Sequence, residues 1–140
     1  MKQIPVIFWT GTGNTQMMAD AVAEAINAAG AEAVVKNVSE ITADEAAGYE
    51  ALALGCPAMG AEVLEECEFE PFFTELEGKL AGKKVALFGS YGWGGSYMQD
   101  WEARVKDAGA TLVADGVLAL GAPDDEAVAK LAEAGKLLAE

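Results

Sequence analysis

A short glycine-rich segment, WTGTGNT at residues 9–15, has the residue types needed to bind a phosphate group. An apolar stretch with helical periodicity follows it, so the amides and the positive dipole end of a first helical turn would face the same ligand. Lys and Arg are absent from residues 3–35. The segment would therefore bind a phosphate through neutral donors alone. These donors, which lie on both sides of Asn14, are the hydroxyls of Thr10, Thr12 and Thr15 and the backbone exposed by Gly11 and Gly13.

An ordinary strand-to-helix turn capped by threonine would use the same residues, and for an isolated glycine pair it is the more common alternative. Two known nucleotide motifs do not match the segment. The P-loop signature GK[ST] is missing, and Gln16 stands where the dinucleotide-binding pattern needs a third glycine.

Two further unusual loops lie at residues 55–62 (GCPAMGAE) and 89–96 (GSYGWGGS). Trp93 stands between two glycines, which favours a stacking platform for a flat aromatic ligand over a core position. Met59 could cover the other face of that ligand, because its thioether packs well on aromatic rings. A core position is about as common for a methionine taken alone.

Apolar runs and helical periodicity predict the elements that position these loops. Strands are expected at residues 4–9, 33–38, 51–54 and 85–88, with a fifth split between 111–113 and 117–120. Helices are expected from the glycine loop to about residue 29, from Pro71, from Ser96 as a cap, and from Asp124 or Asp125. Strands that alternate with helices predict a parallel sheet with helices on both faces, which places the three loops at one edge.

Composition narrows the functional classes. A chain of 140 residues with 52% hydrophobic residues suits one globular domain, residues 1–140. Its 23 acidic and 9 basic residues give a formal charge of -14, which disfavours nucleic acid and anionic membranes and favours basic partners. A solvated acidic surface that only keeps the protein soluble is the alternative.

Histidine is absent, which excludes imidazole catalysis and histidine metal ligands. Neither a signal peptide nor a membrane span is visible, so we expect a cytoplasmic protein.

The three loops, taken in order, resemble those of the short-chain flavodoxins. The matching motifs are TGTGNT at residues 10–15, AMG at 58–60 followed by Glu62, and GSYGWG at 89–94. The resemblance covers essentially the whole chain. It implies an α/β flavodoxin-like three-layer sandwich, a five-stranded parallel sheet of order 2-1-3-4-5, and flavin mononucleotide (FMN) bound without a covalent bond.

The resemblance also implies roles for individual residues. Residues 10–15 and Ser90 would hold the FMN phosphate, and Met59 and Trp93 would sandwich the isoalloxazine ring. The other cofactor-binding residues that it implies are Pro57, Ala58, Gly60, Ala61, Glu62, Tyr91, Gly92 and Gly94. Two positions depart from the family pattern: Ala61 replaces a frequent acidic residue or Asn, and Gly121 replaces a frequent polar residue.

The resemblance further implies an electron-transfer protein that carries single electrons, without catalytic residues or metal. A phosphate held by neutral donors keeps its charge, and Glu62 and the acidic chain add to the negative field at the ring. We therefore expect a low-potential one-electron carrier that works between semiquinone and hydroquinone, a monomer that serves basic-surfaced redox proteins such as reductases and low-potential oxidoreductases.

Two alternatives stay open at this point. A flavin-dependent reductase of the quinone reductase type could use the same fold, although the chain has little spare length for a substrate pocket. A phosphoacceptor signalling domain has a similar topology. It would need acidic residues at the end of the first strand, where Phe8, Trp9 and Thr10 stand.

Overall fold

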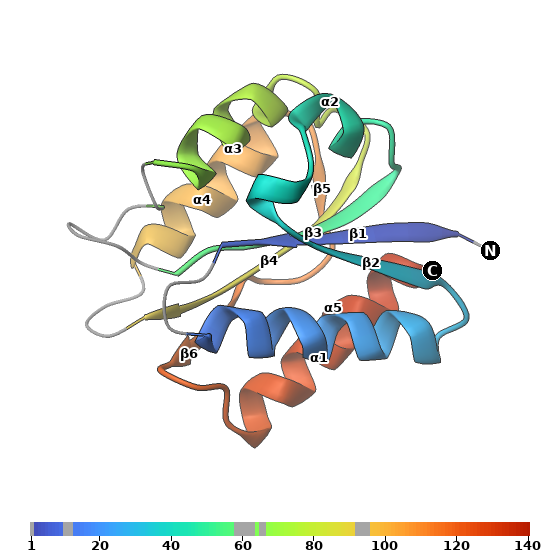
Figure 1. Ribbon diagram of the computed structural model, residues 1–140, viewed down its shortest axis with the longest axis vertical. Coiled ribbons are helices and arrows are strands. Elements are labelled where there is room, and N and C mark those ends of the chain that lie inside the picture. Colours follow the sequence, from blue (N-terminus) through green and yellow to red (C-terminus); the bar gives the residue numbers. More distant parts are fainter. Residues whose placement is uncertain (1, 10–12, 58–63, 65–66, 92–95) are drawn as a thin grey trace.

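A twisted parallel sheet lies at the centre of the computed structural model, which describes residues 2–9, 13–57, 64, 67–91 and 96–140 (Figure 1). The strand order is β2-β1-β3-β4-β5, and β6 also pairs with β4. The strands are β1 (Gln3–Phe8), β2 (Glu32–Asn37), β3 (Ala51–Gly55), β4 (Lys84–Tyr91), β5 (Thr111–Leu112) and β6 (Val117–Leu120). The predicted order and the predicted split of the fifth strand are confirmed.

Helices cover both faces of this sheet, as predicted. The helical elements are α1 (Asn14–Ala28), the 3-10 helix η1 (Val38–Glu40), α2 (Ala43–Ala46), α3 (Phe69–Glu77), α4 (Ser96–Asp107) and α5 (Asp125–Ala139). Helices α1 and α5 lie side by side on one face, and α2, α3 and α4 lie on the other (Figure 1). The molecule is therefore a three-layer α/β sandwich.

Alternation along β1 divides the apolar residues between two cores. Ile4 and Val6 belong to the cluster beneath α1 and α5, while Ile7 points into the cluster beneath α2, α3 and α4. All three are fully buried. Gly135 allows α5 to approach α1 closely, because a Cβ at that position would lie 2.8 Å from the Val22 carbonyl oxygen.

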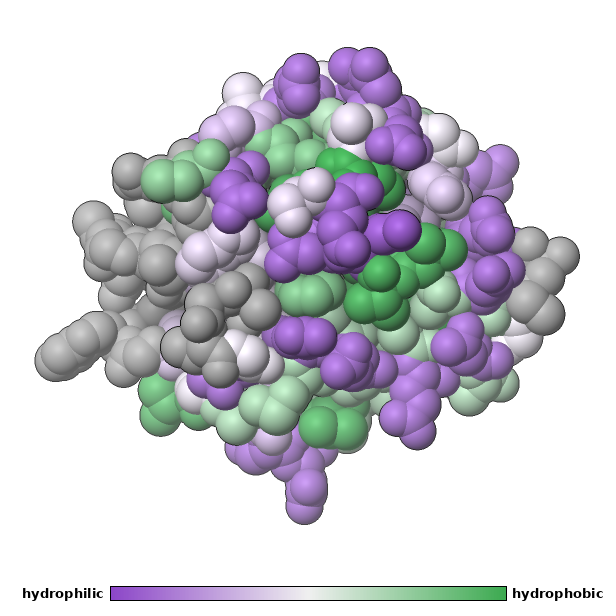
Figure 2. Space-filling view, in the orientation of Figure 1, coloured by the Kyte–Doolittle hydropathy of each residue, from purple (hydrophilic) through white to green (hydrophobic). Residues whose placement is uncertain are grey.

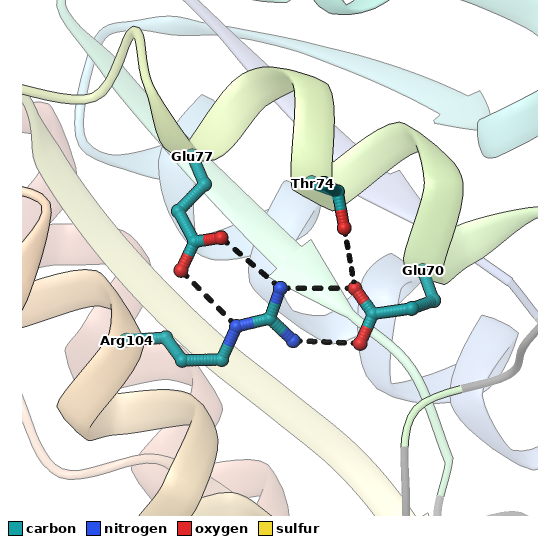
Figure 3. A network of polar contacts seen from close by, with 4 residues as sticks. All are labelled: Glu70, Thr74, Glu77 and Arg104. Carbon is teal, nitrogen blue, oxygen red and sulfur yellow. Dashed lines mark hydrogen bonds and ion pairs between the residues drawn. The ribbon is translucent and has the colours of Figure 1, made fainter.

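Helices α3 and α4 are joined by a charged network above an aromatic cluster. The Arg104 guanidinium donates to both carboxylate oxygens of Glu70, at 2.7 and 2.9 Å, and to both of Glu77, at 3.1 Å each (Figure 3). Beneath it, Trp101 meets Phe69 and Phe73 edge to face, with ring centroids 5.5 and 5.9 Å apart. The two helices are thus fixed by bidentate ion pairs and by aromatic packing.

The network changes the ionisation of its members. Hydrogen bonds from Arg104 lower the pKa of the Glu70 carboxyl, and Thr74 adds a further hydrogen bond at 2.8 Å. The same contact with Glu70 raises the pKa of Arg104. Both partners therefore stay charged over a wider pH range than they would alone.

The structure corrects three details of the predicted elements. Trp9 lies beyond β1, which ends at Phe8, and α3 begins at Phe69 rather than at Pro71. The segment between β2 and β3, in which no element was predicted, holds η1 and α2. Each is stabilised by a capping box, formed by Asn37 with Glu40 and by Thr42 with Glu45.

Candidate cofactor site

The carboxyl ends of four strands meet at one edge of the sheet. Phe8 of β1 pairs with Gly55 of β3, and Gly55 pairs with Phe88 of β4. Tyr91 at the end of β4 pairs with Leu120 at the end of β6. The chain leaves the sheet here at each loop selected from the sequence. Parallel α/β sheets bind ligands at this edge.

Part of the predicted site lies outside the described residues. These positions are Thr10, Gly11, Thr12, Ala58, Met59, Gly60, Ala61, Glu62, Gly92, Trp93 and Gly94. The described positions are Gly13, Asn14, Thr15, Pro57, Ser90 and Tyr91. The structure brings these six to the same edge, from the start of α1 and the residue before it, from the chain beyond β3, and from β4.

Two buried hydroxyls lie together at this edge. Thr15, in the first turn of α1, is fully buried, and Ser90, on β4, is 6% exposed. Their Oγ1 and Oγ atoms lie 3.3 Å apart, and either atom could be the donor. When one hydroxyl donates to the other, the accepting group keeps its own hydrogen for a third partner. The pair can therefore donate to an anion at the end of the helix.

The start of α1 adds a positive potential to these hydroxyls. Gly13 precedes the helix with φ of 92°, a left-handed conformation that glycine adopts at little cost. The first intrahelical bond runs from the Met17 amide to the Gly13 carbonyl at 3.1 Å. The first turn contains no acidic residue. No carboxylate of that turn therefore cancels the positive end of the helix dipole.

Other contacts hold the chain where it enters and leaves the loops. The Trp9 amide donates to the Gly55 carbonyl at 3.0 Å, and its indole Nε1 donates to the Glu68 carboxylate at 3.2 Å. Trp9 thus links the ends of β1 and β3 to the residue before α3. The Tyr97 hydroxyl donates to the Cys56 carbonyl at 2.8 Å. Sequence reasoning missed both contacts.

The last described part of the site lies beside β6. The Gly121 amide donates to the Tyr91 carbonyl at 3.1 Å, and Gly121 has φ of 71°. The backbone conformation gives a reason for glycine at this departure from the family pattern, because other residues adopt a positive φ only with strain.

The arrangement suits an anion held by hydroxyls and a helix terminus, with no cation in the first turn of α1.

Among the described residues, no group of three or more Cys, Asp or Glu side chains is placed to hold a metal ion. In the same part of the chain, no helix has the length and apolar character to cross a membrane. Cys56 is buried and Cys67 is exposed, and neither forms a disulfide.

Comparisons with known proteins agree with this geometry. The flavodoxin family model matches residues 6–135. The flavodoxin of Clostridium beijerinckii is 47% identical over 135 residues, which cover 96% of this chain and 97% of that protein. The flavodoxin of Megasphaera elsdenii is 46% identical over 116 residues, which cover 82% of this chain and 85% of that protein. The solution structure of two-electron reduced Megasphaera elsdenii flavodoxin superposes with a TM-score of 0.90 at 42% identity, covering 97% of this chain and 98% of that one.

Proposed function

We propose that this chain, which belongs to the flavodoxin family of FMN-binding electron-transfer proteins, is a low-potential one-electron carrier. Flavodoxins are electron carriers rather than enzymes. FMN supplies the redox chemistry when bound, and the proposed working couple is that between semiquinone and hydroquinone. The protein's own residues bind the cofactor and set that potential.

The buried hydroxyl pair of Thr15 and Ser90 is the observation that carries the proposal. A hydroxyl pair 3.3 Å apart, at a helix start without an acidic residue in its first turn, fits a phosphate ester. We assign the phosphate to residues 10–15 together with Ser90. The described members of this set already lie together, and the helix end favours the anion that they would bind.

We place the ring beside the phosphate, between the chain that follows β3 and the chain that follows β4. Met59 and Trp93 would cover its two faces, and Glu62 would accept a hydrogen bond from its polar edge. The other contacts would come from Pro57, Ala58, Gly60, Ala61, Tyr91, Gly92 and Gly94. Tyr91 is half-buried at the end of β4, which is consistent with a position at the wall of this pocket.

The low potential follows from charge. A phosphate held by neutral donors keeps its negative charge, and no Lys or Arg occurs in residues 3–35, 37–78 or 85–103. These ranges contain all three loops. A second electron would therefore enter a site that already carries negative potential, in a chain of net charge -14. The field disfavours the fully reduced anion and lowers the potential of the second step.

Basic-surfaced redox proteins are the partners that this charge would attract. Figure 2 shows hydrophilic side chains over much of the described surface on one face, with smaller apolar patches between them. Glu68, the residue before α3, is exposed, and Leu120 at the carboxyl end of β6 is 67% exposed. Acidic side chains would steer a basic partner, and an apolar side chain would contribute to the contact.

Reconstitution of the apoprotein tests the proposal. Apoprotein mixed with FMN should bind one equivalent and quench the fluorescence of FMN. During slow reduction, the FMN-bound protein should pass through a stable one-electron state. Riboflavin, which lacks the phosphate, should bind more weakly. Protein that takes up no flavin would contradict the cofactor assignment, while protein that binds FMN but is reduced in a single two-electron step would contradict the one-electron function.

A further inference from the structure

One buried hydroxyl links the two stretches of chain that flank the proposed ring position. The Tyr97 hydroxyl, on the second residue of α4, donates to the carbonyl of Cys56 at 2.8 Å. Cys56 is the first residue after β3, and its own amide donates to the Phe88 carbonyl of β4 at 3.1 Å. The two backbone groups of Cys56 are therefore fixed by different elements, one by β4 and the other by α4.

The surroundings of this bond show that it is built into the fold. Tyr97 is 2% exposed and Cys56 is fully buried. Burial raises the pKa of the Tyr97 hydroxyl, so it remains a donor throughout the physiological range. Gly89 of β4 lies directly beneath, and a Cβ at that position would collide with the Cys56 carbonyl and the Tyr97 hydroxyl. Glycine is thus required at position 89 for the tyrosine to reach the carbonyl.

The position of the bond along the chain gives it a function. Residue 56 leads into the chain that carries Met59 and Glu62, and residue 97 follows the chain that carries Trp93. We propose that Tyr97 is a positioning residue for the flavin ring. Its hydrogen bond joins the start of the chain that carries Met59 and Glu62 to the end of the chain that carries Trp93. The proposal rests on the FMN site described above.

The bond should matter more to the FMN-bound protein than to the apoprotein. A buried carbonyl that loses its donor must find another partner or remain unsatisfied. In the apoprotein, a small displacement of Cys56 would let water replace the lost donor at that carbonyl. With the ring bound, the same displacement would disturb the position from which the chain enters the proposed ring site. Loss of the hydroxyl should therefore reduce affinity for the ring and leave the phosphate side of the site unchanged.

Tyr97→Phe tests this with little disturbance, because it removes one oxygen and keeps the packing of the aromatic ring. Two control variants separate positioning from general destabilisation. Tyr49→Phe makes the same chemical change at a half-buried tyrosine before β3, at the other end of that strand. Ile26→Val trims a fully buried residue in the last turn of α1, far from the start of that helix.

Three quantities are measured for each apoprotein: the dissociation constants for riboflavin and FMN by fluorescence quenching, and the increase in thermal midpoint caused by inorganic phosphate. For Tyr97→Phe we expect riboflavin and FMN to weaken by the same factor, about tenfold, which corresponds to about 1.4 kcal/mol. The phosphate effect should match that of the wild type. Both control variants should keep wild-type flavin affinities.

The inference is overturned if Tyr97→Phe binds both flavins as the wild type does. It is equally overturned if the phosphate effect declines in parallel with flavin affinity, or if Ile26→Val loses flavin affinity to the same extent, because the hydroxyl would then contribute only general stability. If phosphate raises the thermal midpoint of the wild-type protein but neither flavin binds, the cofactor assignment is refuted, and this inference with it.

Discussion

The hydroxyl oxygens of Thr15 and Ser90 lie 3.3 Å apart in the interior, although 75 positions separate the two residues in the chain. The parallel sheet brings them together, because α1 starts and β4 ends at the same edge. Taken alone, a pair of buried hydroxyls would leave one O–H without an acceptor. At the start of a helix it also completes a set of neutral donors for a dianion.

Removing either hydroxyl should weaken FMN binding and leave riboflavin binding nearly unchanged. A hydrogen bond to a charged group contributes about 1.5–3 kcal/mol, so Thr15→Val or Ser90→Ala should raise the FMN dissociation constant by roughly 10- to 150-fold. Fluorescence titration of each apoprotein with both flavins measures the effect. Equal losses for FMN and riboflavin would show that the pair does not contact the phosphate.

The Arg104 network should contribute to stability in a pH-dependent way. The folded-state pKa of Glu70 lies below its ordinary value of 4.5 because Arg104 donates to it. The contribution is therefore complete above about pH 4.5 and is lost as the pH falls through the lowered folded-state value. Urea unfolding from pH 3 to 7 should show a smaller acid-induced loss of stability in Glu70→Gln than in the wild type. If Glu70→Gln and the wild type lose the same unfolding free energy at acid pH, the pairing of Glu70 with Arg104 is contradicted.

Arg104→Gln tests the same network from its other side. The variant leaves Glu70 and Glu77 without their shared cation, and about a third of each side chain is exposed. Solvent screening limits the effect, so we expect a loss of about 1 kcal/mol in unfolding free energy at pH 7. Lys130→Gln, which breaks an exposed i,i+4 pair with Glu126, is the control and should cost less than about 0.5 kcal/mol. Equal effects of the two variants would contradict a special role for the network.

Gly89→Ala should be among the most damaging single-methyl additions in the described chain. Its Cβ would meet the Cys56 carbonyl and the Tyr97 hydroxyl, so backbone must move, at a cost of about 1–3 kcal/mol or more. Gly78→Ala is the matched control. That residue ends α3 with φ of -73° and has nothing within 4 Å of the added methyl. Thermal unfolding should separate the two variants clearly, and similar midpoints would contradict the close packing at position 89.

Local signals explain which parts of the fold could be predicted. The apolar run of β3 is buried along its whole length, and Asp124 caps α5 through a 2.8 Å bond to the Ala127 amide, as its sequence position indicates. Helices η1 and α2 were missed although both carry a readable signal. Each begins with Asn or Thr followed three residues later by Glu, a capping box with little apolar periodicity behind it.

Long-range contacts could not be predicted in the same way. The Tyr97 hydroxyl reaches Cys56 across 41 positions, and Arg104 reaches Glu70 across 34. Both contacts depend on the packing of α4 against its neighbours, which local periodicity does not specify. The loops could be found from the sequence because each combines glycines, hydroxyls or aromatic residues within a few positions. That signal does not depend on the distant residues that they contact.

Charge steering predicts a dependence on ionic strength. Electron transfer with a basic-surfaced redox protein should become markedly slower when salt is raised from about 10 to 300 mM, because the Debye length shrinks from about 30 Å to below 8 Å. Stopped-flow rates with one basic and one acidic partner test this, and the acidic partner should show the opposite trend. Rates independent of salt for the basic partner would contradict steering by the acidic surface.

A potentiometric titration of the FMN-bound protein tests the central claim most directly. If neutral donors hold a charged phosphate inside an acidic protein, the second one-electron step must occur at a potential clearly more negative than in free FMN, and raised salt should shift it upward. A second step at or above the potential of free FMN would contradict the account.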